Sequence, residues 1–188
     1  MATIVVGGTG KHCGKTALKC GLIAALAEFR WTAVKITSHE HGKLNSIWEE
    51  TAGGQATDTA RYLAAGARRA LLVSVGEGEL GRVFPDLMEK IEPDADVIFE
   101  SNRILEFIKP HVCLMVNGGD EQISRKESFD IAVQYADAMV IRSDSDRVRL
   151  DSAVRADEDA KPIFHLADLE VISPQMLAWV RLKLSGRI

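Results

Sequence analysis

Residues 4–20 read "IVVGGTGKHCGKTALKC", and this stretch decides the fold. A short apolar run leads into several glycines, and Gly-Lys-Thr at 14–16 then opens a helical pattern. In a phosphate-binding loop, backbone N–H groups surround a phosphate, a lysine meets its charge and a hydroxyl group reaches Mg²⁺. An apolar strand before the loop and an amphipathic helix after it are the context that such a loop requires. The stretch therefore predicts a phosphate-binding loop.

Thr9 departs from the usual pattern GxxxxGK[ST], which has glycine at this position. The physical requirement is a permissive backbone, and neighbouring glycines supply it: Gly7, Gly8 and Gly10. Gly14 lets the chain approach a phosphate closely, and Lys15 and Thr16 stand where the amine and the hydroxyl group belong. We therefore predict that Lys15 neutralises phosphate charge and that Thr16 binds Mg²⁺.

Short apolar runs alternate with helical patterns along the whole chain. The runs are continuously apolar, which is typical of strands covered on both faces. Strands are predicted over 3–8, 32–37, 69–75, 95–101, 111–117, 137–143 and 161–167. Helices are predicted over 15–28, 57–65, 83–91, 126–135, 146–156 and 174–184. This alternation indicates an α/β fold with a mostly parallel sheet and helices on both faces.

Composition narrows the class of protein. The 188 residues suit a single domain over 1–188, and the net charge of −4 argues against nucleic acid or an anionic membrane as the main partner. No apolar run approaches the roughly 18 residues of a membrane span, and Met1 leads directly into a strand rather than a secretory signal. The three cysteines lack CxxC spacing, so we expect reduced thiols in a cytoplasmic protein.

Two segments, 38–54 and 118–125, fit no predicted element. Long loops in a compact domain are usually functional or mobile, and both begin at the carboxyl ends of strands, where α/β sheets bind ligands. His39 and His41 in the first segment lack firm metal-ligand spacing, so we interpret them as polar loop residues near a nucleotide.

Two acids are placed to complete a Mg²⁺ site, because Mg²⁺ prefers hard oxygen ligands. Glu100 ends the apolar run "DVIFE", so its carboxylate emerges at the sheet edge where the phosphate-binding loop begins. Asp58 begins the helix after the 38–54 segment, where it serves the metal or only the helix dipole. Hydrolysis would need a positioned water molecule, which Asp58 or Glu100 could hold.

Lys35 and Asn117 are two further polar residues in apolar strands. Lys35 either extends to solvent or meets a phosphate or carboxylate at the same sheet edge. Asn117 ends its strand, where it contacts a nucleotide base or forms the turn of "NGGD"; the turn is favoured.

Five segments together resemble the molybdopterin-guanine dinucleotide biosynthesis adaptor family, MobB. They are "VKIT", "TDTARYLAAGA", "DVIFES", "ADAMVIRSD" and "KPIFHLADLE". The family has a lysine in its second strand, an acid seven residues before Ala-Gly-Ala, and a strand that ends in glutamate. Here these features correspond to Lys35, Asp58 and Glu100, and the resemblance covers nearly the whole chain.

The resemblance implies a P-loop NTPase fold of the SIMIBI type. It implies a Mg²⁺-dependent homodimer that binds GTP, with ATP as the alternative, hydrolyses it weakly and assists the enzyme that attaches GMP to molybdopterin. Thr16, Asp58 and Glu100 would bind the metal, and Asp144 would accept hydrogen bonds from guanine, which adenine cannot match. The phosphates would lie on Gly10, Lys11, His12, Cys13, Gly14, Lys15, Thr16 and Ala17.

The chain departs from this family in ways that leave a rival function open. Its loop "GTGKHCGKT" resembles the dethiobiotin synthetase and cobyrinic acid synthase branch of P-loop proteins, and Ser101-Asn102-Arg103 replaces the family's Gly-Phe-Lys. The rival is an ATP-dependent enzyme that activates a small carboxylate by phosphoryl transfer, with Lys35 on the substrate anion. The Gly-Ala-Gly-Gly that such enzymes carry after the glutamate is absent from the sequence.

Overall fold

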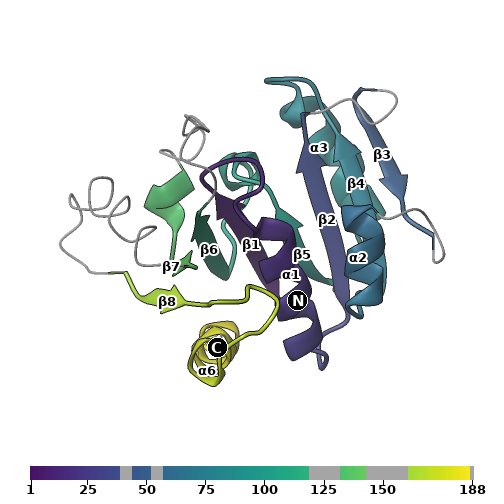
Figure 1. The fold of residues 1–188 in the computed structure, drawn as a ribbon. Coiled ribbons are helices and arrows are strands. Elements are labelled where there is room, and N and C mark those ends of the chain that lie inside the picture. Colours follow the sequence, from purple (N-terminus) through teal and green to yellow (C-terminus); the bar gives the residue numbers. More distant parts are fainter. Residues whose placement is uncertain (39–43, 52–56, 119–131, 143–160, 187–188) are drawn as a thin grey trace.

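A computed structural model describes residues 1–38, 44–51, 57–118, 132–142 and 161–186 (Figure 1). Its centre is a sheet of eight strands in the order β3-β4-β2-β5-β1-β6-β7-β8. The strands are β1 Thr3–Gly8, β2 Trp31–Thr37, β3 Ser46–Glu49, β4 Arg69–Ser74, β5 Asp96–Glu100, β6 Val112–Asn117, β7 Ala138–Ile141 and β8 Ile163–His165. Every pairing is parallel except that of β3 with β4, so the predicted α/β class with a mostly parallel sheet is confirmed.

Helices cover both faces of this sheet (Figure 1). Residues of α1, α2 and α6 share one apolar cluster with the sheet, whereas α3 joins a second cluster on the opposite face. The described helices are α1 Lys15–Ala25, α2 Asp58–Ala64, α3 Leu80–Lys90 and α6 Pro174–Ser185, with short 3-10 turns η1 Arg103–Glu106 and η2 Val133–Tyr135. The predicted helix 146–156 and most of the predicted helix 126–135 lie outside the described residues.

The central position of β1 follows from its sequence. Ile4, Val5 and Val6 are fully buried, and their side chains alternate between the two apolar clusters because successive residues of a strand point to opposite faces. Strands β5 and β6 pair with its two edges. The loop after β1 therefore leaves the middle of the sheet at its carboxyl edge, where α/β proteins bind ligands.

The segment 38–54, predicted to hold no regular element, contains strand β3. This prediction was wrong for Ser46–Glu49, which pair antiparallel with β4 at the edge of the sheet. Only four residues take part, and they are half-buried or exposed, so they lack the continuous apolar run that marks the central strands.

The three cysteines, Cys13, Cys20 and Cys113, are free thiols in the interior. Within the described ranges, no helix combines the length and the apolar character that crossing a membrane requires.

Candidate nucleotide-binding site

The loop between β1 and α1 has the close turn that its glycines predict. Gly14, directly before α1, has a φ of 102°, in the left-handed region that disfavours side chains. A Cβ atom on Gly14 would lie 2.1 Å from Leu169 Cδ1, and one on Gly8 would lie 2.5 Å from Cys13 Sγ. The first N–H groups of α1 have no side-chain cap, so they remain available to an anion.

Two polar side chains brace the start of this loop. Thr9, which stands where the usual pattern has glycine, donates a 2.9 Å hydrogen bond from its hydroxyl group to the Gly118 carbonyl oxygen. Asn102, just after β5, accepts a 2.9 Å hydrogen bond from the Gly8 N–H and donates a 3.0 Å bond to the Gly8 carbonyl oxygen. The loop is thus fixed to the ends of both strands that flank β1.

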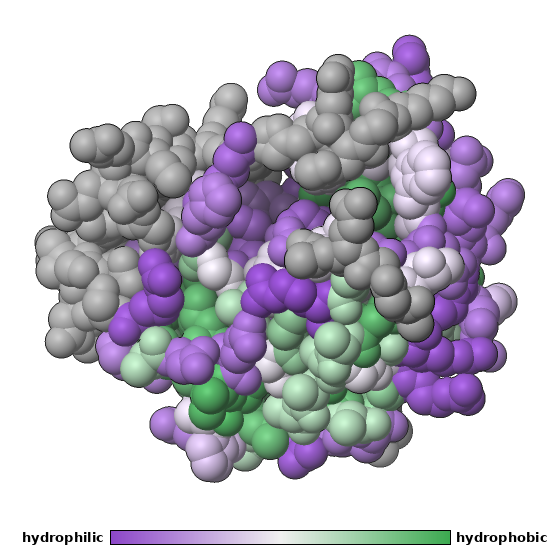
Figure 2. Space-filling model, turned by 45° about the vertical axis from the view of Figure 1, so that its right-hand side comes forward, coloured by the Kyte–Doolittle hydropathy of each residue, from purple (hydrophilic) through white to green (hydrophobic). Residues whose placement is uncertain are grey.

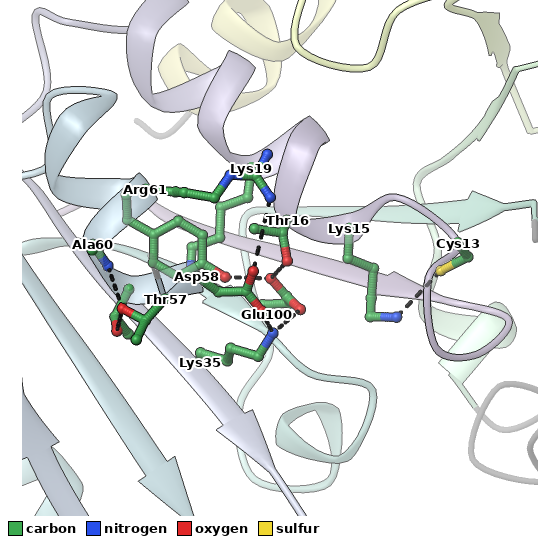
Figure 3. Close-up of polar contacts among 12 residues, drawn as sticks. Cys13, Lys15, Thr16, Lys19, Lys35, Thr57, Asp58, Ala60, Arg61 and Glu100 are labelled. Carbon is green, nitrogen blue, oxygen red and sulfur yellow. Dashed lines mark hydrogen bonds and ion pairs between the residues drawn. The ribbon is translucent and has the colours of Figure 1, made fainter. Parts of the chain in front are cut away.

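Lys15 lies across the loop (Figure 3). Its ammonium group donates to the Gly10 carbonyl oxygen and lies 3.2 Å from Cys13 Sγ. The Cys13 thiol is fully buried and lies 3.2 Å from the same carbonyl oxygen. Cys13 therefore holds the loop together from inside, while Lys15 places a positive charge at its mouth.

Glu100 joins the loop to the end of β5. The residue is buried, and its Oε2 accepts a 3.0 Å hydrogen bond from the Thr16 hydroxyl group (Figure 3). The same oxygen accepts from the Tyr62 hydroxyl group, whereas Oε1 lies 3.1 Å from Lys35 Nζ. The carboxylate is thus held by donors from α1, α2 and β2.

Asp58 faces Glu100 from the first turn of α2. Both carboxylates contact the ammonium group of Lys35, which lies between them (Figure 3). Thr57 caps this helix by accepting a 3.0 Å hydrogen bond from the Ala60 N–H. The Glu50 carboxylate accepts from the Thr57 hydroxyl group at 2.7 Å, which anchors the cap and with it the position of Asp58.

The charges of this cluster set its protonation. Burial alone would raise the pKa of Glu100, but the positive charges of Lys35 and Lys19, the Tyr62 hydroxyl group and Lys15 together lower it. Burial alone would lower the pKa of Lys35, but Glu100 and Asp58 raise it. Near neutral pH the site therefore holds an ionised Glu100 beside a protonated Lys35.

Loop, acids and lysine surround one open cleft of about 590 Å³. Figure 2 shows hydrophilic residues around a hollow in the upper half of one face. Nearly all of the described residues that the sequence places in the nucleotide site line this cleft: Gly10, Lys11, His12, Gly14, Lys15, Thr16, Ala17, Lys35, Asp58 and Glu100. Ser38 and Arg103 also line the cleft.

Some predicted residues do not line the cleft or lie outside the described part of the chain. Cys13 is buried within the loop, and Asn117 is buried at the end of β6, so neither is among the lining residues. Asp144, His39 and His41 fall outside the described residues, and their predicted places stay predictions.

The oxygen atoms of Thr16, Asp58 and Glu100 fit Mg²⁺, which takes hard oxygen ligands and keeps several water molecules. The described residues hold no group of three or more His, Cys, Asp or Glu side chains arranged for a metal ion. A Mg²⁺ ion bound here would therefore be held by these three side chains and by the phosphate oxygens of a bound nucleotide. Lys35 contacts the same carboxylates, so an ion and the ammonium group would compete for them.

Sequence reasoning missed several residues of this site, among them Asn102, Arg61, Tyr62 and Lys19. Asn102 differs from the resembled family at its position, and that difference was the available signal. Arg61 lines the cleft and forms an ion pair with Glu170 at 2.5 Å. The sequence did not reveal this role, because an arginine on a polar helix face is usually only a solvated charge. Tyr62 and Lys19 are fully buried, and nothing in their helical spacing separates them from ordinary core or surface positions.

No protein-family model and no curated protein matches the sequence. Solved structures resemble its fold. HypB from Helicobacter pylori, in complex with nickel, is 14% identical with a TM-score of 0.57, over 98% of this chain and 88% of HypB. LpxK from Aquifex aeolicus, in complex with ATP, is 14% identical with a TM-score of 0.51, over 87% of this chain. The match spans 53% of the LpxK chain. MobB from Bacillus subtilis is 16% identical over the whole of both chains, with a TM-score of 0.43.

The fold and the loop define the class: this chain has the α/β fold of P-loop NTPases. The structures of HypB and LpxK carry that assignment, and at such low identity they show the fold alone.

Proposed function

We propose that the protein binds a nucleoside triphosphate with Mg²⁺ in this cleft, prefers GTP, and hydrolyses it weakly. The observation that carries the proposal is the hydrogen bond between Thr16 and Glu100, which brings a hydroxyl group of the phosphate-binding loop onto a buried carboxylate. A hydroxyl and a carboxylate beside a lysine-bearing loop are the groups that a Mg²⁺-bound polyphosphate needs. Resemblance to the MobB family supports an adaptor that presents a nucleotide-dependent conformation to a partner enzyme of molybdenum cofactor biosynthesis, as a homodimer.

Each part of the site has a physical task in binding. The N–H groups before and within the first turn of α1 would surround the phosphates, and Lys15 would release the Gly10 carbonyl oxygen to meet their charge. Bound Mg²⁺ supplies positive charge between the phosphate oxygens and the protein's own oxygens. Thr16, Asp58 and Glu100 would hold that ion.

Weak hydrolysis is consistent with the ionised state of Glu100. A general base must accept a proton from water, and its pKa is best matched to that task near the working pH. The pKa of Glu100 is lowered by Lys35 and its other donors, which makes it a poor base. Glu100 would therefore orient water better than deprotonate it.

Calorimetric titration tests the proposal. GTP, ATP and their diphosphates are titrated with and without Mg²⁺, and we expect GTP with Mg²⁺ to bind most tightly. Absence of binding by every triphosphate would refute the proposed function. Asp144→Asn tests base choice, because an amide no longer accepts both guanine hydrogen bonds, so the preference for GTP over ATP should shrink.

The second candidate is phosphoryl transfer from ATP to a small carboxylic acid. It is favoured by the positive side chains of the cleft wall, which include Arg61 and Arg103 besides Lys35 and could hold a substrate anion. Turnover separates the two functions. With nucleotide and Mg²⁺ alone, an adaptor should give slow hydrolysis, whereas multiple turnovers that appear only after a small acid is added would favour the enzyme.

A further inference from the structure

Two fully buried polar residues lie behind the cleft without lining it. Tyr62 projects from α2, and Lys19 projects from α1 into the same apolar cluster. Both have no solvent-exposed side-chain surface. Buried polar groups are costly unless they are hydrogen-bonded, and a buried ammonium group is among the most costly. The contacts of Tyr62 and Lys19 indicate which function compensates for the free-energy cost of burying them.

Tyr62 acts directly on Glu100. Its hydroxyl group donates to Glu100 Oε2, the oxygen that also accepts from Thr16 at 3.0 Å. The other carboxylate oxygen contacts Lys35 at 3.1 Å. Donors on both oxygens, from three different elements, fix the rotation of the carboxylate about its last bond.

Lys19 acts through Tyr62 and through its charge. Its Nζ donates a 2.8 Å hydrogen bond to the Val34 carbonyl oxygen and lies 3.8 Å from the centre of the Tyr62 ring. A cation over an aromatic face is attracted to it, so this contact holds the ring in place. Burial lowers the pKa of Lys19 to about 7, while the negative charge of Glu100 opposes that change. The attraction is mutual, and Lys19 helps to lower the pKa of Glu100.

We propose that Tyr62 and Lys19 are positioning residues for Glu100: Tyr62 fixes the direction of its carboxylate, and Lys19 holds the Tyr62 ring in place. The inference rests on the proposed function in one respect, that Glu100 is the metal-binding carboxylate. An apolar residue in place of Lys19 would fill the same space without the cost of burying an amine, so packing alone does not account for a lysine at this position.

The direct test is the titration of Glu100 in the protein without nucleotide. The ¹³C resonance of its side-chain carboxyl group, assigned by its loss in Glu100→Gln, is followed against pH in the wild type and in Tyr62→Phe. Tyr62→Phe removes only the hydroxyl group, so the Glu100 titration should move to higher pH. Tyr135→Phe is the matched control, because Tyr135 is the other tyrosine and is exposed. It should leave the titration unchanged.

Lys19→Met keeps the proposal testable if Tyr62→Phe does not fold. Methionine is similar in length and apolar, so folding should persist, with stability at pH 7 equal to or above that of the wild type. The Glu100 titration should again move to higher pH. An unchanged titration in the folded variants would overturn the proposal.

A second readout separates positioning from general structural support. In Tyr62→Phe the ratio of GTP affinity with Mg²⁺ to that without it should fall about tenfold, while binding without Mg²⁺ stays the same. Equal losses with and without Mg²⁺ would overturn the positioning role. If the wild type binds no nucleotide, the proposed function fails, yet the carboxyl titration still decides whether Tyr62 and Lys19 control Glu100.

Discussion

The Thr16 hydroxyl group donates a 3.0 Å hydrogen bond to Glu100 Oε2, across 84 positions of sequence. Because β5 pairs with β1, the end of one strand and the loop after the other meet at the same sheet edge. The bond therefore joins the phosphate-binding loop, through the hydroxyl group proposed to bind Mg²⁺, to the carboxylate at the end of β5. Single substitutions in each part, and in the residues that support them, should have distinct effects on binding and stability.

Lys15→Ala should weaken nucleotide binding about 10- to 100-fold, because it removes a charged hydrogen bond to phosphate. The far-UV circular dichroism spectrum should stay native, since the contacts of Lys15 lie within the loop. Lys90→Ala is the matched control, an exposed lysine on α3 across the sheet, and should bind as the wild type does. Unchanged affinity in Lys15→Ala would contradict the site.

Glu100→Gln should remove most of the Mg²⁺ dependence of nucleotide binding. It should also lower the free energy of unfolding near pH 7 by about 1–3 kcal/mol, because one carboxylate oxygen becomes a donor that faces other donors. Since the pKa of Glu100 is lowered from 4.5 in the fold, its ionised form stabilises the protein above that pH and loses this effect as pH falls further. Denaturant titrations from pH 7 to 3 should therefore show a weaker acid dependence in Glu100→Gln than in Glu106→Gln, an exposed control.

Asn102→Ala should loosen the phosphate-binding loop. The substitution removes both hydrogen bonds to Gly8, at 2.9 and 3.0 Å, and should cost about 1–2 kcal/mol of unfolding free energy in urea titrations. Triphosphate affinity should fall with and without Mg²⁺ alike, because the loop rather than the metal site is disturbed. A loss confined to Mg²⁺ conditions would contradict this role.

Lys19 should make stability rise with pH between about 7 and 9. Its pKa is about 7 in the fold, against an ordinary value of 10.5 for a lysine, so in this range the unfolded chain binds more protons. Glu100, Lys35, Cys20 and Asp58 also act on Lys19. Above about 9 the buried thiols, whose pKa values are raised, oppose the rise. Lys19→Met should flatten the curve between pH 7 and 9 in urea titrations; an unchanged slope would contradict the assignment.

Sequence patterns predicted the central strands because continuous apolar runs have few other uses in a globular protein. β1 matches its predicted range, β2 and β6 differ from theirs by one residue at one end, and β5 is one residue shorter at each end. The short β3 was missed because its pairing depends on the open edge of β4 rather than on its own apolar content. An edge strand of this kind is set by its neighbour, which local sequence does not contain.

In the candidate site, too, some residues could be predicted from the sequence and others could not. Lys35, Asp58 and Glu100 were expected near one sheet edge, and the structure brings all three together in one cluster. Tyr62 and Asn102 were missed because their roles are contacts across long stretches of sequence, to Glu100 and to Gly8. Motifs report groups that touch a ligand, whereas the residues that hold those groups are defined by three-dimensional packing.

The contact between Gly14 and Leu169 has a consequence for biosynthesis. The turn at Gly14 packs against a residue from the last part of the chain, and β1 needs both β5 and β6 at its edges. On the ribosome, β1 and the loop after it emerge early, but they can reach their final conformation only after nearly all later segments have been synthesised. Nucleotide should therefore protect nascent chains from proteolysis only after synthesis has passed Leu169.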